Sequence, residues 1–91
     1  MNYEWDNDKN LRNMRERGID FALVEDFEWQ NASIGEDTRR NYGERRFRAM
    51  GPIDGRLHVL IYTIREETLR IISLRRANKR EEAIYEKTQK T

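Results

Sequence analysis

The run of residues 57–64, Leu-His-Val-Leu-Ile-Tyr-Thr-Ile, most constrains what this chain can fold into. It is almost continuously apolar and rich in β-branched side chains, which favour the extended backbone of a strand. It lacks the regular alternation of apolar and polar residues that a strand with one solvent-exposed face shows. The run therefore predicts a central strand of a sheet that is covered on both faces.

Further strands are predicted on both sides of this run. Residues 68–75 form a strand after the polar turn at 65–67, and residues 45–50 alternate in part before the Gly-Pro-Ile-Asp-Gly turn signal at 51–55. Residues 32–38 are expected to add an edge strand. Because short turns connect strands of this length, the sequence predicts a small antiparallel sheet of three to four strands.

Two short helices are predicted before the sheet. Asp6 is a candidate N-cap of the first helix, and Gly18 is the glycine at which this helix ends. Leu11 and Met14 are three residues apart and are expected to form its apolar stripe, with the arginines next to them facing outward. The second helix is expected to begin at an Asp20 cap. Three apolar residues then recur at three-residue intervals, namely Phe21, Val24 and Phe27.

A third helix is predicted after the sheet. Asn78 and Glu81 have the spacing of a capping box, and Ala83, Ile84 and Tyr85 supply apolar area. The order of elements is then two short helices, the sheet and a C-terminal helix. This order predicts an α+β fold in which the helices pack against a small antiparallel sheet.

Composition limits the class of protein. The 91 residues suffice for one domain with one small core, so residues 1–91 are expected to form a single domain. There is no cysteine, and no segment approaches 18 consecutive apolar residues. The sequence also lacks a secretion-signal pattern, so the expected location is the cytoplasm, without membrane contact. Of the 18 basic residues 14 are arginines, whose planar guanidinium suits bidentate phosphate contacts, although a salt-bridged surface explains the bias equally well.

Positive charge is densest in residues 70–80, where the last predicted strand runs into the last helix. Regular alternation would place Arg70 on one face of the strand with Ile72 and Leu74. It would place Arg75 on the other face with Ser73. The first-turn N–H groups of a helix favour an anion, so the stretch predicts a phosphate-binding site.

An alternative interpretation of residues 70–80 involves Glu44. It has the chemistry of a general base, but a carboxylate among arginines more often orients one of them. In the alternative, Arg70 pairs with a structural carboxylate such as Glu44, and the remaining cations form a solvated basic edge.

Other chemistries have less support in the sequence. His58 is the only histidine, so a two-histidine ribonuclease site cannot form, and a lone strand histidine is more often structural. Tyr62 is expected mainly to pack in the core. No metal-ligand cluster, phosphate-cradling glycine loop or Ser-His-Asp motif is present, so neither a metal nor a cofactor is expected.

The order of motifs resembles the BrnT family of bacterial toxins from about residue 4 to residue 87. The resemblance is carried by Trp5-Asp6, Lys9, Asn13 and Gly18-Ile19-Asp20-Phe21, by Tyr42-Gly43-Glu44-Arg45-Arg46, by Arg70-Ile71-Ile72-Ser73-Leu74-Arg75-Arg76-Ala77, and by Glu81 and Tyr85. The Arg-Ile-Ile-Ser-x-Arg-Arg-Ala stretch is its most specific part.

This resemblance implies a RelE-like fold and an endoribonuclease toxin that halts translation without a metal ion. It further implies neutralisation by a ribbon–helix–helix antitoxin, and a complex that represses its own operon through operator DNA. Arginines and lysines would stabilise the anionic transition state formed when a ribose 2′-hydroxyl attacks the neighbouring phosphate. The residues expected to act in catalysis are Arg70, Arg75, Arg76, Glu44 and Lys9, and those expected to bind RNA phosphates are Arg45, Lys79 and Arg80.

One pair of residues departs from the family pattern. The family usually has Lys-His before the Gly-Ile pair, whereas this chain has Glu16-Arg17. A guanidinium cannot exchange protons near neutral pH as an imidazole does. The departure motivates a second hypothesis, a catalytically degenerate toxin that serves as an antitoxin-binding co-repressor. A third is a nucleic-acid-binding domain with no toxin role.

Overall fold

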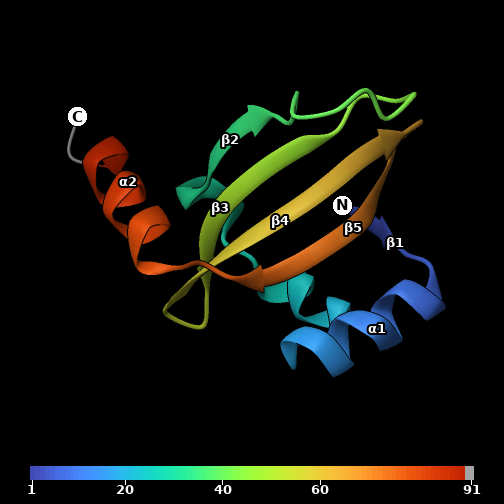
Figure 1. Cartoon of the computed structure of the whole chain (residues 1–91), viewed down its shortest axis with the longest axis horizontal. Coiled ribbons are helices and arrows are strands. Elements are labelled where there is room, and N and C mark those ends of the chain that lie inside the picture. The colour runs from blue at the N-terminus through green and yellow to red at the C-terminus, as the bar shows by residue number, and fades with distance from the viewer. Residues whose placement is uncertain (90–91) are drawn as a thin grey trace.

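A five-stranded sheet in the order β1-β5-β4-β3-β2 organises the chain, whose residues 1–89 the computed structural model describes (Figure 1). The strands are β1 (Asn2–Glu4), β2 (Ser33–Glu36), β3 (Phe47–Ile53), β4 (Arg56–Arg65) and β5 (Thr68–Arg76). The helices are α1 (Asn7–Arg17) and α2 (Lys79–Gln89), with 3₁₀ segments η1 (Phe21–Asp26) and η2 (Trp29–Asn31). The predicted α+β class is confirmed. The sheet, however, is mixed and has five strands, because β1 pairs with β5 in parallel while the other pairs are antiparallel.

The predicted central strand is confirmed as β4, the middle strand of the sheet. Residues 58–63 are all buried, as expected for a strand covered on both faces. Leu60 and Tyr62 belong to the main hydrophobic core, which also contains Phe21 and Val24 of η1. Val59 and Ile61 are buried on the opposite face of the sheet.

A β-bulge in β5 overturns the regular alternation expected for that strand. Ile61 pairs with Ser73 whereas Tyr62 pairs with Ile71, so Ile72 is an extra residue without a partner on β4. The extra residue reverses the alternation from that point on. As a result Ile71 and Leu74, three residues apart, both face the core.

The arginines of β5 follow the same shift. Arg70 pairs with Thr63, Ser73 with Ile61, and Arg75 with Val59. These positions alternate with the core-facing ones, so Arg70, Ser73 and Arg75 lie together on the face of the sheet away from the main core. The expectation that Arg70 and Arg75 lie on opposite faces is therefore wrong.

The second predicted helix is a 3₁₀ helix. Asp20 caps it as predicted, since its Oδ1 accepts a hydrogen bond of 2.9 Å from Ala22 N. Side chains three residues apart eclipse one another in a 3₁₀ helix, which has three residues per turn. Phe21 and Val24 are consequently both fully buried, and Phe27 follows them into the core.

Strand β3 is longer than predicted, because Gly51, Pro52 and Ile53 belong to it. The turn signal proves to lie only in Asp54 and Gly55, which have positive φ values of 51° and 79° and join β3 to β4. Proline fits here because the β2–β3 pairing ends at Met50, so on the side of β3 away from β4 its nitrogen faces no paired strand. The edge strand expected at 32–38 is confirmed as β2.

Strand β1 was not predicted. Its three residues are too few to show a periodic pattern, and its pairing partner Thr68 is more than sixty residues away. Trp29 Nε1 donates a hydrogen bond of 2.7 Å to the hydroxyl of Tyr3, which ties β1 to η2.

Helix α1 has its predicted ends, with the Asp6 side chain capping its start and Gly18 in the left-handed conformation at φ 70°. Its predicted apolar stripe is wrong, because Leu11 and Met14 are exposed. The helix packs through asparagines instead. Asn13 donates hydrogen bonds to the carbonyl oxygens of Ile19 and of Leu74 on β5 (2.9 and 2.8 Å), and so covers part of the free edge of that strand.

Helix α2 begins with the predicted capping box. Asn78 Oδ1 accepts from Glu81 N at 2.8 Å, and Glu81 Oε1 accepts from Asn78 N at 3.0 Å. The helix projects beyond one end of the sheet (Figure 1), and the hydroxyl of Tyr85 donates to the carbonyl oxygen of Asn31. Within residues 1–89 no helix has the length and apolar character needed to cross a membrane.

Gly51 provides a test of the core packing. A Cβ atom at this position would lie 2.7 Å from Cζ of Phe27 and 3.3 Å from Cβ of Ala32. Gly51→Ala should therefore lower the free energy of unfolding by about 1–3 kcal/mol through overpacking. Gly35→Ala is the matched control, since a Cβ on this strand glycine meets nothing within 4 Å. Urea denaturation of both variants checks this, and equal stabilities would contradict the packing described for Phe27.

Candidate functional site

Two arginines, from the two strands that flank β4, converge on Glu81. Arg75 of β5 donates to both carboxylate oxygens, with NH1–Oε1 and NH2–Oε2 distances of 2.8 and 2.7 Å. Arg48 of β3 donates to Oε2 at 2.5 Å. Both arginines stand on the face away from the main core, where Arg48 pairs with Ile61 and Arg75 with Val59. The cluster therefore fastens the first turn of α2 to that face.

The electrostatics of Glu81 follow from this geometry. Its side chain is only 9% exposed, and the hydrogen bonds from Arg75 are the main reason that its pKa is lowered from 4.5 to about 2. Arg75 in turn has its pKa raised by Glu81. Such a carboxylate is a poor general base near neutral pH, so its role is to position the two guanidinium groups.

The loop between β2 and β3 adds a third arginine. Arg39 forms a two-point ion pair with the buried carboxylate of Asp37, with both distances 2.8 Å, and these hydrogen bonds are the main reason that the pKa of Asp37 is lowered. The positive charge of Arg39 acts on Arg75 and tends to lower the pKa of its guanidinium. We call Arg39, Arg48 and Arg75 the arginine cluster.

A second basic feature lies between α1 and β5. It is a groove of about 200 Å³, and we call it the α1 groove. Its lining residues are Lys9, Arg12, Asn13, Glu16, Arg17, Ile72 and Ser73. Its three cations and its one carboxylate form no ion pair within residues 1–89.

Ser73 joins the two features. It lines the α1 groove, and it lies on the same face of β5 as Arg75, two residues away. A polyanion lying across β5 at Ser73 would therefore meet the free cations of α1 on one side. On the other side it would meet Arg75, which is 27% exposed, and Arg48, which is 39% exposed.

The predicted site residues divide into two groups. Arg70, Arg75 and Lys9 belong to this side of the molecule, although Arg70 also pairs with Glu4 at 3.5 Å. Arg76 instead lines a pocket with the β3–β4 turn, because neighbouring residues of a strand point to opposite faces. Arg45 stacks over Phe47, a partly buried residue packed against the main core. The structure thus does not bring Arg76 and Arg45 together with Arg75.

The remaining predicted residues contribute less to the two basic features. Lys79 and Arg80 are exposed in the first turn of α2, next to Glu81. Glu44 accepts from Arg46 at 3.1 Å and from Arg65 at 3.3 Å, and these contacts lower its pKa, that of Arg46 being the larger. Glu44 therefore orients arginines, and the carboxylate that pairs with Arg70 is Glu4.

Two further residues have structural surroundings. His58 is 5% exposed, its Nδ1 is 2.8 Å from the carbonyl oxygen of Arg56, and burial lowers its pKa. Tyr62 stacks on Phe47 in the core, and burial raises the pKa of its hydroxyl. Residues 1–89 contain no group of three or more histidine, aspartate or glutamate side chains that could hold a metal ion.

Sequence reasoning missed Arg39 and Arg48 and gave Glu81 only a capping role. Arg48 lies between the apolar residues Phe47 and Ala49, and such an arginine on a predicted strand is a signal for pairing or function. Arg39 lies in an irregular loop, for which the sequence pattern gives no signal. The convergence on Glu81 joins residues 33 positions apart and depends on the tertiary fold.

Comparison with known proteins identifies the protein family. A family model described as "Ribonuclease toxin, BrnT, of type II toxin-antitoxin system" matches residues 5–81. The match includes the α1 groove, the arginine cluster and Glu81. No curated protein matches the chain significantly.

Replacing Glu81 tests the cluster and its pH dependence. Glu81→Gln retains the hydrogen-bonding side chain of the capping box but removes the charge that balances Arg48 and Arg75. At pH 7 the free energy of unfolding should fall by about 3 kcal/mol, the cost typical of breaking a buried ion pair.

The direction in which stability changes with pH follows from the lowered pKa of Glu81. The native chain gains stability from ionised Glu81 above its usual pKa of 4.5 and loses it as pH falls toward about 2. The difference between the native chain and Glu81→Gln should therefore shrink between pH 5 and pH 2 in urea denaturation. Glu82→Gln is the control at an exposed neighbour. A difference independent of pH would contradict the ionised cluster.

Proposed function

Because the chain belongs to the family of BrnT ribonuclease toxins of type II toxin–antitoxin systems, we propose that it is an endoribonuclease that cleaves RNA across β5 at Ser73. The observation that carries this proposal is the meeting of the α1 groove and the arginine cluster at that residue. Cleavage would halt translation in the cytoplasm, on a RelE-like fold whose sheet face away from the main core holds the substrate.

The proposed reaction needs little covalent chemistry from the protein. The ribose 2′-oxygen attacks the adjacent phosphorus, and the bond from phosphorus to the 5′-oxygen breaks, which leaves a cyclic phosphate and a 5′-hydroxyl. The 2′-hydroxyl loses a proton and the leaving oxygen gains one. Negative charge builds up on the phosphoryl oxygens in the transition state, and fixed cations stabilise it most when they need no reorganisation. Glu81 holds Arg48 and Arg75 in such fixed positions.

The free cations of α1 have a different role in this proposal. Lys9, Arg12 and Arg17 are exposed and have no carboxylate partner within residues 1–89, so they are available to neighbouring phosphates of the strand. Arg70 would add to this surface beyond Ser73, partly neutralised by Glu4. Binding would therefore weaken steeply with salt.

The antitoxin is proposed to be a ribbon–helix–helix protein. Its complex with this chain would repress the operon, and the antitoxin would supply most of the contacts to operator DNA. A short reading frame for such a protein next to this gene would support the assignment. The alternative function is a degenerate toxin that retains only antitoxin binding and co-repression, because Glu16-Arg17 replaces Lys-His in the α1 groove.

Removing the cations at the proposed site tests the enzyme. The double variant Arg70→Ala/Arg75→Ala should lower the rate of RNA cleavage, measured in EDTA, by about 100-fold or more. Arg56→Ala/Arg76→Ala is the matched control, since it removes the same charge around a pocket on the other side of β5. Thermal denaturation confirms that each variant is folded. If the native chain leaves RNA as intact as the double variant does, the enzymatic proposal is wrong.

The two residues that depart from the family pattern discriminate between the functions. Glu16 is the one carboxylate of the α1 groove, and in an active enzyme it is the proton acceptor for the 2′-hydroxyl. Glu16→Gln should then reduce cleavage about 100-fold, in line with loss of a general base. In a degenerate toxin Glu16→Gln changes nothing, whereas Arg17→His restores cleavage and growth arrest on expression. Growth curves and RNA integrity after induction measure both outcomes.

A further inference from the structure

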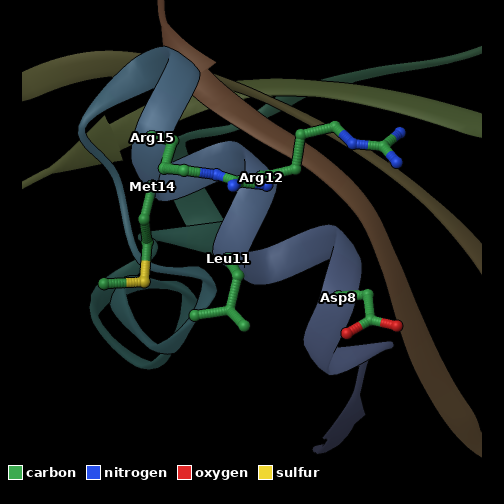
Figure 2. Close-up of a pocket in the computed structure, with 5 residues that line it drawn as sticks. All are labelled: Asp8, Leu11, Arg12, Met14 and Arg15. Atoms are coloured by element: carbon green, nitrogen blue, oxygen red, sulfur yellow. The ribbon is translucent and has the colours of Figure 1, made fainter.

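Helix α1 presents its apolar side chains to solvent. Leu11 is 56% exposed and Met14 is 42% exposed, while the residues that hold the helix to the body are Asn10 and Asn13. Figure 2 shows Leu11 and Met14 projecting from the same side of the helix, where they form part of a depression of about 630 Å³. A helix that contacts the body through amides and exposes its only two large apolar side chains has an unpartnered docking face.

We propose that this outer face of α1 is the surface on which the antitoxin docks, and that docking there covers the α1 groove and blocks RNA. The occupant would be an amphipathic antitoxin segment that places apolar side chains on Leu11 and Met14. The proposal rests on the proposed function, because the partner is taken from the toxin–antitoxin pair.

Charge at the edge of the face defines the partner further. Arg12 and Arg15 line the depression beside the two apolar side chains, and neither forms an ion pair within residues 1–89. Asp8 is the single acidic residue in its lining. A segment that carries carboxylates next to its apolar side chains therefore complements this surface. A basic or uncharged apolar segment would leave both guanidinium groups without a partner.

The other exposed apolar side chains of the body do not form such a pair. Ile34, Ile64 and Ile84 are each about half exposed, but there is only one of them on each of β2, β4 and α2. Leu23 on η1 and Met1 before β1 are also exposed, and each is likewise the one such residue of its segment. Isolated exposed apolar residues are ordinary on protein surfaces. Leu11 and Met14 are instead one helical turn apart and share a lining.

Arg12 links docking to inhibition. It lines the depression around Leu11 and Met14 and also the α1 groove with Ile72 and Ser73. In Figure 2 its guanidinium extends away from the two apolar side chains, toward β5. A carboxylate bound to Arg12 removes a free cation from the RNA surface, and the attached chain occupies the entrance of the α1 groove.

Glutamine substitutions test the docking surface. Leu11→Gln/Met14→Gln removes the apolar contact while glutamine preserves helix propensity. The probe is the tagged protein encoded by the reading frame adjacent to this gene, co-expressed with the full chain and then titrated against it. We expect affinity to fall by about 30-fold or more, the range of a hot-spot pair. Cleavage by the free variant should be unchanged but no longer suppressed by the probe.

Matched variants separate the possible outcomes. Ile64→Gln/Ile84→Gln removes two equally exposed apolar side chains elsewhere and should bind the probe normally. Arg15→Glu, outside the α1 groove, should weaken binding and reduce its salt dependence. Normal binding by Leu11→Gln/Met14→Gln overturns the inference, as does an equal loss in the isoleucine control.

Self-association provides the remaining decisive outcome. If light scattering shows a dimer of the native chain that only Leu11→Gln/Met14→Gln dissociates, the face belongs to a second copy and the inference is wrong. Failure of the proposed function is distinguishable from these results. A native chain that binds the probe through Leu11 and Met14 but never cleaves RNA would refute the nuclease and leave the docking surface standing.

Discussion

The unpaired residue Ile72 sets the arrangement of side chains on which both faces of the sheet depend. Without it, the spacing of Ile71 and Leu74 would turn one of them out of the core. With it, both pack in the core with Phe21 and Val24 of η1, and Ser73 and Arg75 lie on the opposite face. The single bulge residue thus allows the same strand to present apolar side chains to the core and charged side chains to the outer face. Bulges commonly re-aim side chains in this way near functional sites.

The cations on that outer face fall into two electrostatic classes. Arg48 and Arg75 are held by Glu81, so their positions are fixed but their charge is partly balanced. Lys9 and Arg17 in the α1 groove have no carboxylate partner within residues 1–89, so no ion pair balances their charge and none fixes their side chains. A surface that binds RNA and stabilises a transition state needs both kinds, because free charge attracts the polyanion and fixed charge favours the transition state.

The local features were predictable because their causes are local. Asp6, Asp20 and the Asn78–Glu81 pair cap the elements they were expected to cap, since a cap depends on residues two to four positions apart. The site was predictable only in part. Arg75 was identified by its place at a strand–helix junction, but its separation from Arg76 and its partner Glu81 depend on which face each side chain takes. Regular alternation gave the wrong faces because a bulge leaves no clear mark in the pattern.

The sequence by itself determined the α+β class, the central strand β4, the helix ends and, through its motifs, the family. These follow from short-range periodicity and from motif spacings, both of which are visible in the sequence alone. Only the tertiary structure decided that Leu11 and Met14 face solvent while Asn10 and Asn13 hold α1. Asn13 donates to the carbonyl oxygen of Leu74 on the free edge of β5, and Asn10 accepts from Phe21 N, and aliphatic side chains cannot satisfy such groups. It likewise decided that Arg48 and Arg75 share one face of the sheet. Pairing between strands that are distant in the sequence decides which side chains lie next to one another, and no local sequence pattern predicts that pairing.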